Sequence, residues 1–251
     1  MIKFFRHIRK DLMETGKTGK YFKYAIGEIV LVVIGILIAL SINNWNEERK
    51  KSIQGKEYVS EIYNDVKKDI LRINDILGKL EINKVKSRYI LEILESEDKY
   101  IADSSLFVQN MLNTNAVIDV RRQKRTWDEL RSSGKIEMID NDSLDDLLKN
   151  FYEYYDKQVY QFSETPAKTR EQNRTANSKC ADIISIDRYW KKGGDKSYNK
   201  SWFTCIINDS EFKKDVVAIH LSTYWQIHHF AKIKAEGQSI IDYMDKTIIL
   251  K

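Results

Sequence analysis

Residues 24–45 read YAIGEIVLVVIGILIALSINNW, and this stretch decides the fold because it is the only part of the chain apolar enough to leave water. Every side chain from Ile29 to Leu40 is apolar. At about 1.5 Å per helical residue the stretch spans roughly 30 Å, which is the thickness of the hydrocarbon core of a bilayer. Tyr24 and Trp45 stand at its ends, where aromatic rings prefer the membrane interface. The stretch therefore predicts a single transmembrane helix over residues 24–45.

The net charge of +5 lies entirely ahead of this helix. Residues 1–24 carry seven Lys and Arg against two acidic residues, which leaves 35 cations and 35 anions in the rest of the chain. Because Lys and Arg next to a transmembrane helix favour the cytoplasmic side, we expect residues 1–23 in the cytoplasm. Residues 46–251 are then expected in the periplasm of a bacterium, with residues 24–45 in its inner membrane. The neutral exported part argues against nucleic-acid binding.

The N-terminal region leaves two alternatives open. Residues 1–13, MIKFFRHIRKDLM, suit a basic amphipathic helix lying on the lipid bilayer, or a basic flank that only fixes the orientation. The apolar run could also be a cleaved signal peptide, since Ala39 and Ser41 have the spacing of a small-residue cleavage site. The long segment ahead of the run and the residues Asn44 and Trp45 after it favour an uncleaved anchor.

Three residues of the predicted span are candidates for function. Glu28 is an ionisable residue one turn inside the cytoplasmic end, where its carboxylate can reach water or a basic neighbour, or serve a proton or partner-pairing role. Gly35 and Ala39 form a small-xxx-small face, which would let a second helix approach closely. Such pairs are frequent by chance in apolar spans, so this face is only a candidate for self-association.

The N-terminal sequence resembles that of a known family. YAIGEIVLVVIGILIALSINNWNE, preceded by MIKFFRHIR and GKTGKY, resembles the shared N-terminus of an uncharacterised family of single-pass membrane proteins, a domain of unknown function common in flavobacteria and their relatives. TWDELRSSGKIEMIDNDSLDDLLKNFYEYYD at 126–156 is similar to the second recurring pattern of that family. The resemblance covers roughly residues 1–50 and 126–156. It implies an inner-membrane anchor with a periplasmic helical domain, and it implies no activity. A resemblance to bacterial pilins fails because Lys23 stands where the processing glycine is required.

The remainder of the chain predicts long amphipathic helices. Apolar residues step by three and four over about 50–97, 142–176 and 209–249, which is the pattern of a helix with one buried face. We expect a break near Gly78–Asn83, because an unbroken first helix would be a rod of about 75 Å. The fold class predicted is all-α, with an antiparallel helical-bundle domain after the transmembrane helix.

Local motifs predict several helix ends and surfaces. Thr126 and Glu129 have the spacing of a capping box, and Ser133-Gly134 suits a left-handed helix end. The basic residues of 121–125 are interpreted as a solvated turn rather than a site for an anionic partner. The aromatic residues of FYEYYDKQVYQF at 151–162 are interpreted as core rather than a ligand groove.

Residues 180–207 are the least regular part of the sequence. CADIISIDRYW and SWFTCII flank a Gly-Gly, lysine-rich loop, and they either pair as a small hairpin or cross over the helices. Cys180 and Cys205 lie one in each arm. In an oxidising periplasm they favour a disulfide that closes about 25 residues and adds roughly 3 kcal/mol, whereas in the cytoplasm they would be two reduced thiols.

The sequence carries no motif for catalysis, for a cofactor or for a metal. His220, His228 and His229 on the last predicted helix lack the i, i+4 spacing of a helical zinc site. We therefore expect no enzyme and no cofactor, but a protein-interaction or scaffold role with another envelope or membrane protein, or with a second copy. The alternative is a ligand-sensing bundle that signals through a partner subunit, for which a cavity near Tyr152–Tyr160 would speak. An enzyme is a third class without a supporting motif.

Overall fold

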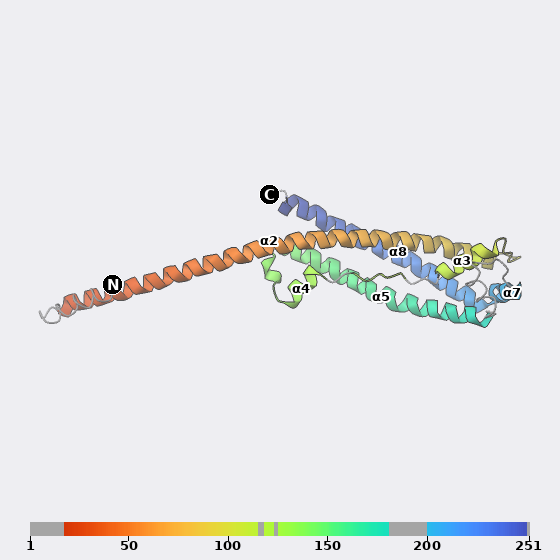
Figure 1. Cartoon of the computed structure of the whole chain (residues 1–251), viewed down its shortest axis with the longest axis horizontal. Coiled ribbons are helices and arrows are strands. Elements are labelled where there is room, and N and C mark those ends of the chain that lie inside the picture. The colour runs from red at the N-terminus through yellow and green to blue at the C-terminus, as the bar shows by residue number, and fades with distance from the viewer. Residues whose placement is uncertain (1–17, 115–117, 123–124, 181–199, 250–251) are drawn as a thin grey trace. The chain divides into compact units, whose positions relative to one another are not determined.

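The computed structural model describes residues 18–114, 118–122, 125–180 and 200–249. Within these residues every regular element is a helix and no strand occurs (Figure 1). The chain divides into two compact units, residues 1–57 and 58–251. Residues 1–17, which include the whole of the predicted amphipathic stretch 1–13, lie outside the described residues, so that prediction stays open.

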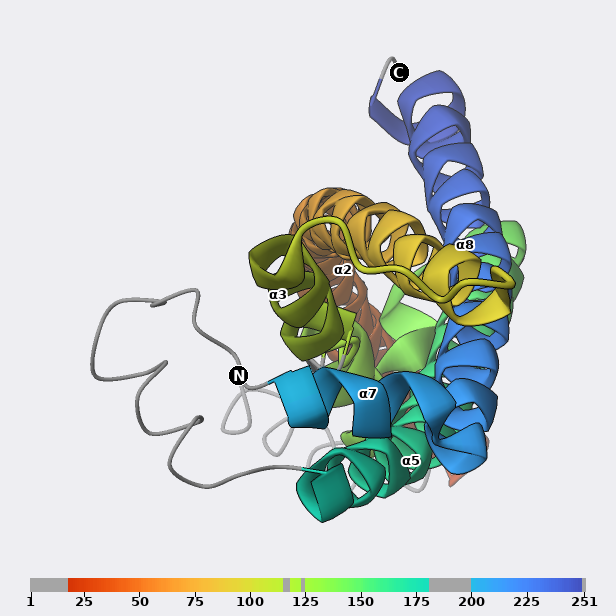
Figure 2. The ribbon, with the colours of Figure 1, turned by 90° about the vertical axis from the view of Figure 1, so that its right-hand side faces the viewer.

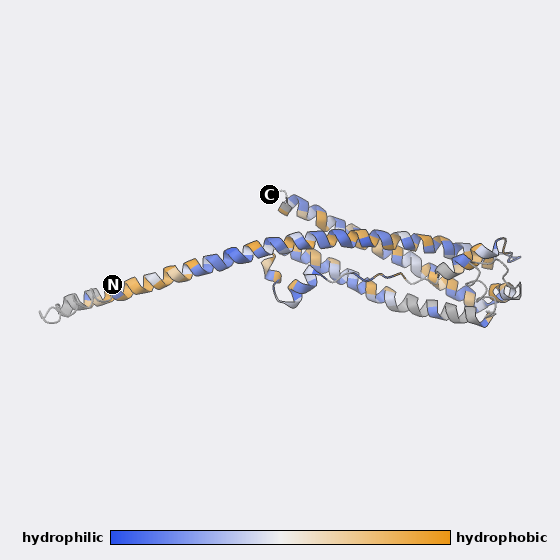
Figure 3. Cartoon of the chain, in the orientation of Figure 1, coloured by the Kyte–Doolittle hydropathy of each residue, from blue (hydrophilic) through white to orange (hydrophobic). Residues whose placement is uncertain are grey.

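The predicted span lies in the first part of helix α2, Thr18–Glu95. Figure 3 shows a continuous hydrophobic stretch there, and its best window has a mean hydropathy of 2.8 with none of it buried inside the protein. By length and composition this is one helix able to cross a membrane. A signal sequence would have the same properties.

The predicted break near Gly78–Asn83 is wrong, because α2 continues without interruption to Glu95. A glycine inside a helix costs up to about 1 kcal/mol relative to alanine. Ile76 and Leu80 on either side of Gly78 are both buried, so a break would expose two large aliphatic side chains. Burying each contributes about 1.5–3 kcal/mol, which exceeds the cost of the glycine.

Two further long helices pack with the later part of α2. They are α5, Asp142–Cys180, and α8, Ser210–Met244, which is followed by the short π-helix η2, Asp245–Ile249. The Tyr63 hydroxyl donates to an Asp245 carboxylate oxygen over 2.8 Å, and the Ser87 hydroxyl lies 2.7 Å from His220 Nδ1. Tyr63 thus contacts the segment directly after α8, whereas Ser87, further along α2, contacts α8 itself. Figure 2 shows α5 and α8 beside α2.

The described residues of the unit 58–251 form two hydrophobic clusters. The first joins α2, α5 and α8 with α4, Thr126–Ser132. The second joins the end of α2 and the start of α8 with α3, Ser104–Thr114, and α7, Lys200–Asn208. Leu80 is the last α2 residue of the first cluster, and Ile90 is the first fully buried one of the second. The buried α2 residues between them, Asn83 and Ser87, are polar, as are Thr223 and Gln226 of α8.

The helix ends agree only in part with the predicted motifs. Asn141 Oδ1 accepts from the Leu144 amide over 2.9 Å, and Asp209 caps α8 by accepting from Glu211 and Phe212. Gly134 has φ +68°, the left-handed conformation expected at the end of α4. The predicted capping box at Thr126 is wrong, because Arg125 precedes the first helical residue and no side chain of the motif caps it.

The predicted hairpin near 180–207 is wrong in its second arm. Residues 200–208 form α7, in which Trp202 and Ile206 lie one helical turn apart and both are buried in the second cluster. A period of four residues is helical, whereas a strand would alternate every two. The loop and most of the first arm, residues 181–199, lie outside the described residues.

Candidate functional site

A charged cluster at the junction of α2, α4 and α5 is the most densely bonded polar feature of the described residues, and Arg122 is its centre. Only 4% of its side chain is exposed. Its guanidinium donates two hydrogen bonds to Asp128, of 2.7 and 2.9 Å, and two to Asp156, of 2.7 and 2.8 Å. It also lies 4.6 Å from the centre of the Tyr152 ring. Burial by itself lowers the pKa of Arg122, but the hydrogen bonds and charges of Asp128 and Asp156 outweigh it, so the net pKa is raised above that of a free arginine. The cation therefore persists at any physiological pH.

The buried carboxylate of Asp65 holds the start of α4. Its Oδ2 accepts from the Thr126 hydroxyl over 2.9 Å and from the Thr126 amide over 3.3 Å, and its Oδ1 accepts from Arg125 over 3.1 Å. In the predicted capping box, the Glu129 side chain would accept a hydrogen bond from the Thr126 amide. Asp65 of α2 accepts it instead. This explains why Thr126 adopts a helical position instead of capping the helix itself.

Asp69, one turn further along α2, is 5% exposed. Burial raises its pKa from 3.8 to about 7, with Asp65 adding to the effect, while Arg122, Arg125 and Arg72 oppose it. No ion pair among the described residues reaches this carboxyl. Burial also raises the pKa of Tyr155, and neither its hydroxyl nor Arg72 Nε has a hydrogen-bond partner within the described part of the chain. The cluster thus contains a carboxyl that titrates near neutrality.

A surface cleft of about 590 Å³ opens above this cluster, at the side of Asp65 and Arg125. Its lining is polar and carries both signs of charge: Glu61, Asn64, Asp65, Lys68, Arg125, Thr126, Asp128 and Glu129. The Asp65 and Arg125 groups already bond to each other, so their charge is largely compensated. No set of three His, Cys, Asp or Glu side chains in the described residues could hold a metal ion.

The basic residues of 121–125 turn out to have different roles. Arg121 is 77% exposed and bonds only its neighbour Asp119, as expected of a solvated turn, whereas Arg122 is buried. The sequence alone cannot show which of these two adjacent arginines is buried, because that depends on contacts with residues far away in the chain, such as Asp156. The burial of Asp65 and Asp69 could have been predicted more readily, because these two acidic residues interrupt the apolar face of a predicted amphipathic helix.

A second candidate surface lies on the outer face of α8. Leu221, Tyr224 and Trp225 are 55%, 46% and 62% exposed, and His228 is exposed beside them. We call these four residues the α8 face. Lys84 Nζ of α2 lies 5.4 Å from the centre of the Tyr224 ring and pairs with Glu81, so a Lys–Glu ion pair borders the face. Exposed aromatic residues grouped on one helix face are typical of interaction surfaces.

The other two histidines of α8 make contacts inside the unit. His229 Nδ1 lies 2.6 Å from the Tyr154 hydroxyl, and His220 Nδ1 lies 2.7 Å from the Ser87 hydroxyl. Burial lowers the pKa of both imidazoles, with nearby cations acting in the same direction. Of the aromatic run at 151–162, Phe151, Tyr152, Tyr155 and Phe162 are buried in the first cluster, as the interpretation as core predicts, but it is wrong for Tyr160, which is 68% exposed.

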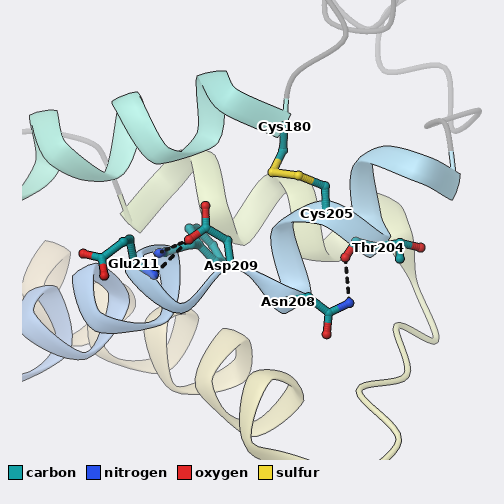
Figure 4. Close-up of a disulfide and its surroundings, with 7 residues drawn as sticks. Cys180, Thr204, Cys205, Asn208, Asp209 and Glu211 are labelled. Carbon is teal, nitrogen blue, oxygen red and sulfur yellow. Dashed lines mark hydrogen bonds between the residues drawn. A yellow bond between two sulfur atoms is a disulfide. The ribbon is translucent and has the colours of Figure 1, made fainter.

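Cys180 at the end of α5 and Cys205 in α7 form a disulfide (Figure 4). Their Cα atoms lie 5.6 Å apart and they are separated by 25 residues. The bond joins two helices on either side of residues 181–199. The Asn208 side-chain amide donates to the Thr204 carbonyl over 2.8 Å, and Asp209 begins α8 directly afterwards. The disulfide therefore ties α5 to the short segment that leads into α8.

The predicted site residues of the span lie on the described part of α2, within the unit 1–57. A Cβ added at Gly35 would meet nothing within 4 Å, and Ala39 is exposed. Glu28 is half-exposed. The candidate roles of these three residues in helix association and in proton or partner pairing stay predictions.

Comparison with known proteins places the chain in one family without naming an activity. No curated protein matches the chain, and neither does any solved structure. A family of unknown function, DUF6090, matches residues 28–221, which include the later part of the apolar stretch, the charged cluster, both cysteines and the start of the α8 face. Because this match covers more than half of the chain, the protein belongs to the DUF6090 family.

Proposed function

We propose that this protein is a single-pass inner-membrane protein whose periplasmic helical bundle binds another envelope protein. In this proposal residues 1–23 stay in the cytoplasm, residues 24–45 span the bilayer, and residues 46–251 form the exported antiparallel bundle. The charge asymmetry supports the orientation, since seven Lys and Arg precede the apolar stretch. The length and hydropathy of α2 support the anchor.

The α8 face is the observation that carries the interaction role. Trp225 leaves 62% of its surface exposed, although burying an aromatic residue is one of the largest gains a protein can make. Trp and Tyr are also the residues that most often dominate binding energy at interfaces. A partner that presents apolar residues flanked by polar groups would cover the α8 face and hydrogen-bond with the Lys84–Glu81 pair at its edge.

The alternatives receive less support. A ligand-sensing bundle calls for a cavity near Tyr152–Tyr160, and the cleft described above is lined by residues outside that range. An enzyme calls for uncompensated reactive groups in a pocket. The carboxylate of Asp65 in this cleft is already engaged by Arg125 and Thr126.

Affinity capture tests the proposal. The tagged full-length chain is purified from detergent-solubilised membranes, beside Trp225→Ala and the control Tyr160→Ala, which removes an equally exposed aromatic ring (68%) from α5. A partner should be captured with the wild type and the control, and at least about tenfold less with Trp225→Ala, since losing a central aromatic residue commonly costs more than 1.4 kcal/mol. Recovery of the chain alone, or equal capture by all three, would count against an interaction role.

A further inference from the structure

The later part of α2 exposes a second apolar surface, distinct from the α8 face. Leu71, Ile82 and Val85 are 69%, 52% and 66% exposed, and Gly78 is exposed between them. We call these four residues the exposed row. Leu71, Gly78 and Val85 are seven residues apart, and Ile82 lies four after Gly78 and three before Val85. Alternating steps of three and four along one face are the pattern of a coiled-coil seam.

The opposite side of the same helix segment is fully covered by this chain. Ile73, Leu80 and Ser87 also repeat every seven residues, and each is 0% exposed. In heptad terms they occupy the position that points away from a coiled-coil seam. The helix therefore has two faces: one packs in the core of this unit, and the other offers aliphatic side chains to a further helix.

We propose that α2 of a second copy of this chain packs in parallel against the exposed row. The parallel direction rests on the proposed membrane anchor, because two anchored copies leave the bilayer from the same end of α2. Anchoring also confines both copies to one surface and raises their effective concentration, so a modest seam suffices.

The charges beside the exposed row fit this arrangement. In a parallel coiled coil a residue in the g position faces an e-position residue five places later on the partner helix. With Leu71, Gly78 and Val85 in d positions, Glu81 of one copy faces Lys86 of the other, in both directions. Glu81 pairs with Lys84 in its own helix through one carboxylate oxygen, and its side chain is 49% exposed.

Asp75 is the polar position of the seam, between Leu71 and Gly78. Its carboxylate bonds Lys79 of the same helix over 2.6 Å, which reduces repulsion between the two copies. A single polar residue in an a position costs stability but favours one register over others. The seam is thus short and its alignment is set by Asp75 and by the Glu81 and Lys86 pairs.

Cysteine cross-linking in membranes tests the proposal directly. The two native cysteines are joined in a disulfide, so a cysteine introduced into the full-length chain is its only free thiol. Val85→Cys should form a homodimer under mild oxidation at least about tenfold faster than Tyr160→Cys, a control of similar exposure on α5 outside both surfaces, since only the former is held at high effective concentration. Equal rates, or an adduct of Val85→Cys with a different protein, would overturn it.

A charge exchange supplies the second test. In the Val85→Cys background, Glu81→Lys should slow dimer formation several-fold, because it opposes Lys86 of the partner copy, and adding Lys86→Glu should restore it. No restoration would contradict the parallel register. The cross-linking and affinity-capture experiments can fail separately. If the dimer does not form, a partner should still be captured through Trp225. If no partner is captured, Val85→Cys should still cross-link.

Discussion

The carboxyl of Asp69 makes the stability of the protein depend on pH. Its pKa in the folded protein is raised to about 7, first by burial, whereas in the unfolded chain it returns to about 3.9. Between these two values the folded protein binds more protons than the unfolded chain. The free energy of unfolding therefore falls as pH rises from about 4 to about 7, by up to about 4 kcal/mol from this residue.

Asp69→Asn should abolish this dependence. Compared with the wild type, the variant should become relatively more stable at pH 8 than at pH 5 in urea unfolding of the purified full-length chain. Asp75→Asn is the matched control, since Asp75 is on the same helix with a side chain 60% exposed, and it should leave the slope unchanged. If wild type and Asp69→Asn lose stability in parallel between these pH values, Asp69 does not titrate in that window.

Arg121 and Arg122 are adjacent in sequence but should differ widely in their effect on stability. Arg122→Ala removes four hydrogen bonds and leaves Asp128 and Asp156 facing each other, so it should cost at least about 2 kcal/mol. Arg121→Ala should leave the stability close to that of the wild type, because its side chain is 77% exposed and water screens its ion pair. Denaturant midpoints of the two variants measure the difference. Similar midpoints would show that the buried pairs contribute little net stability.

At the scale of whole elements, two helical glycines test how α2 and α8 are packed. A Cβ at Gly78 would meet nothing within 4 Å, so Gly78→Ala should stabilise the protein by about 0.5–1 kcal/mol. A Cβ at Gly237 of α8 would lie 3.2 Å from Ile70 and from Phe151, so Gly237→Ala should destabilise despite the same gain in helix propensity. Thermal unfolding of both variants checks this, and a gain for both would mean that α8 can move away from α2.

Sequence patterns predicted which segments are helical better than they predicted where helices begin or turn. The periods of three and four over 50–97, 142–176 and 209–249 correspond to observed helices. The predicted break at Gly78 is wrong because the buried Ile76 and Leu80 beside it favour a continuous helix. The predicted capping box at Thr126 is wrong because Asp65, from another helix, accepts the hydrogen bonds of Thr126. In α8 the period of three and four places Tyr224 on the apolar face, but Tyr224 is exposed, while the polar Thr223 and Gln226 are buried.

At the scale of the whole molecule, the sequence identified the apolar stretch and the neutral domain after it, but not the surfaces of that domain. Hydrophobicity alone is sufficient to identify a stretch long and apolar enough to cross a membrane, because no partner residue is needed to define it. Arg122 and the α8 face are different, since their roles depend on which side chains from other helices cover them. The same applies to Val85, whose exposure is evident only once Leu80 is seen to face the core.

The disulfide links the fold to the compartment in which the domain resides. Disulfides persist in oxidising compartments and are reduced in the cytoplasm, so the Cys180–Cys205 bond should form only if residues 46–251 are exported. In cell membranes, denatured full-length chain should therefore show no thiol that reacts with an alkylating reagent. The same chain without residues 1–45 should stay in the cytoplasm and show two.

Breaking the bond by Cys205→Ser should also lower the free energy of unfolding, by about 3 kcal/mol for a closed loop of this length. Mass-shift alkylation of the native and the anchorless chains measures the thiols, and denaturant unfolding of the purified chain measures the stability. Two reactive thiols in the membrane-bound chain would place the helical domain in the cytoplasm. The orientation given by the seven N-terminal cations would then be reversed, and with it the side of the membrane on which a partner of the α8 face must be sought.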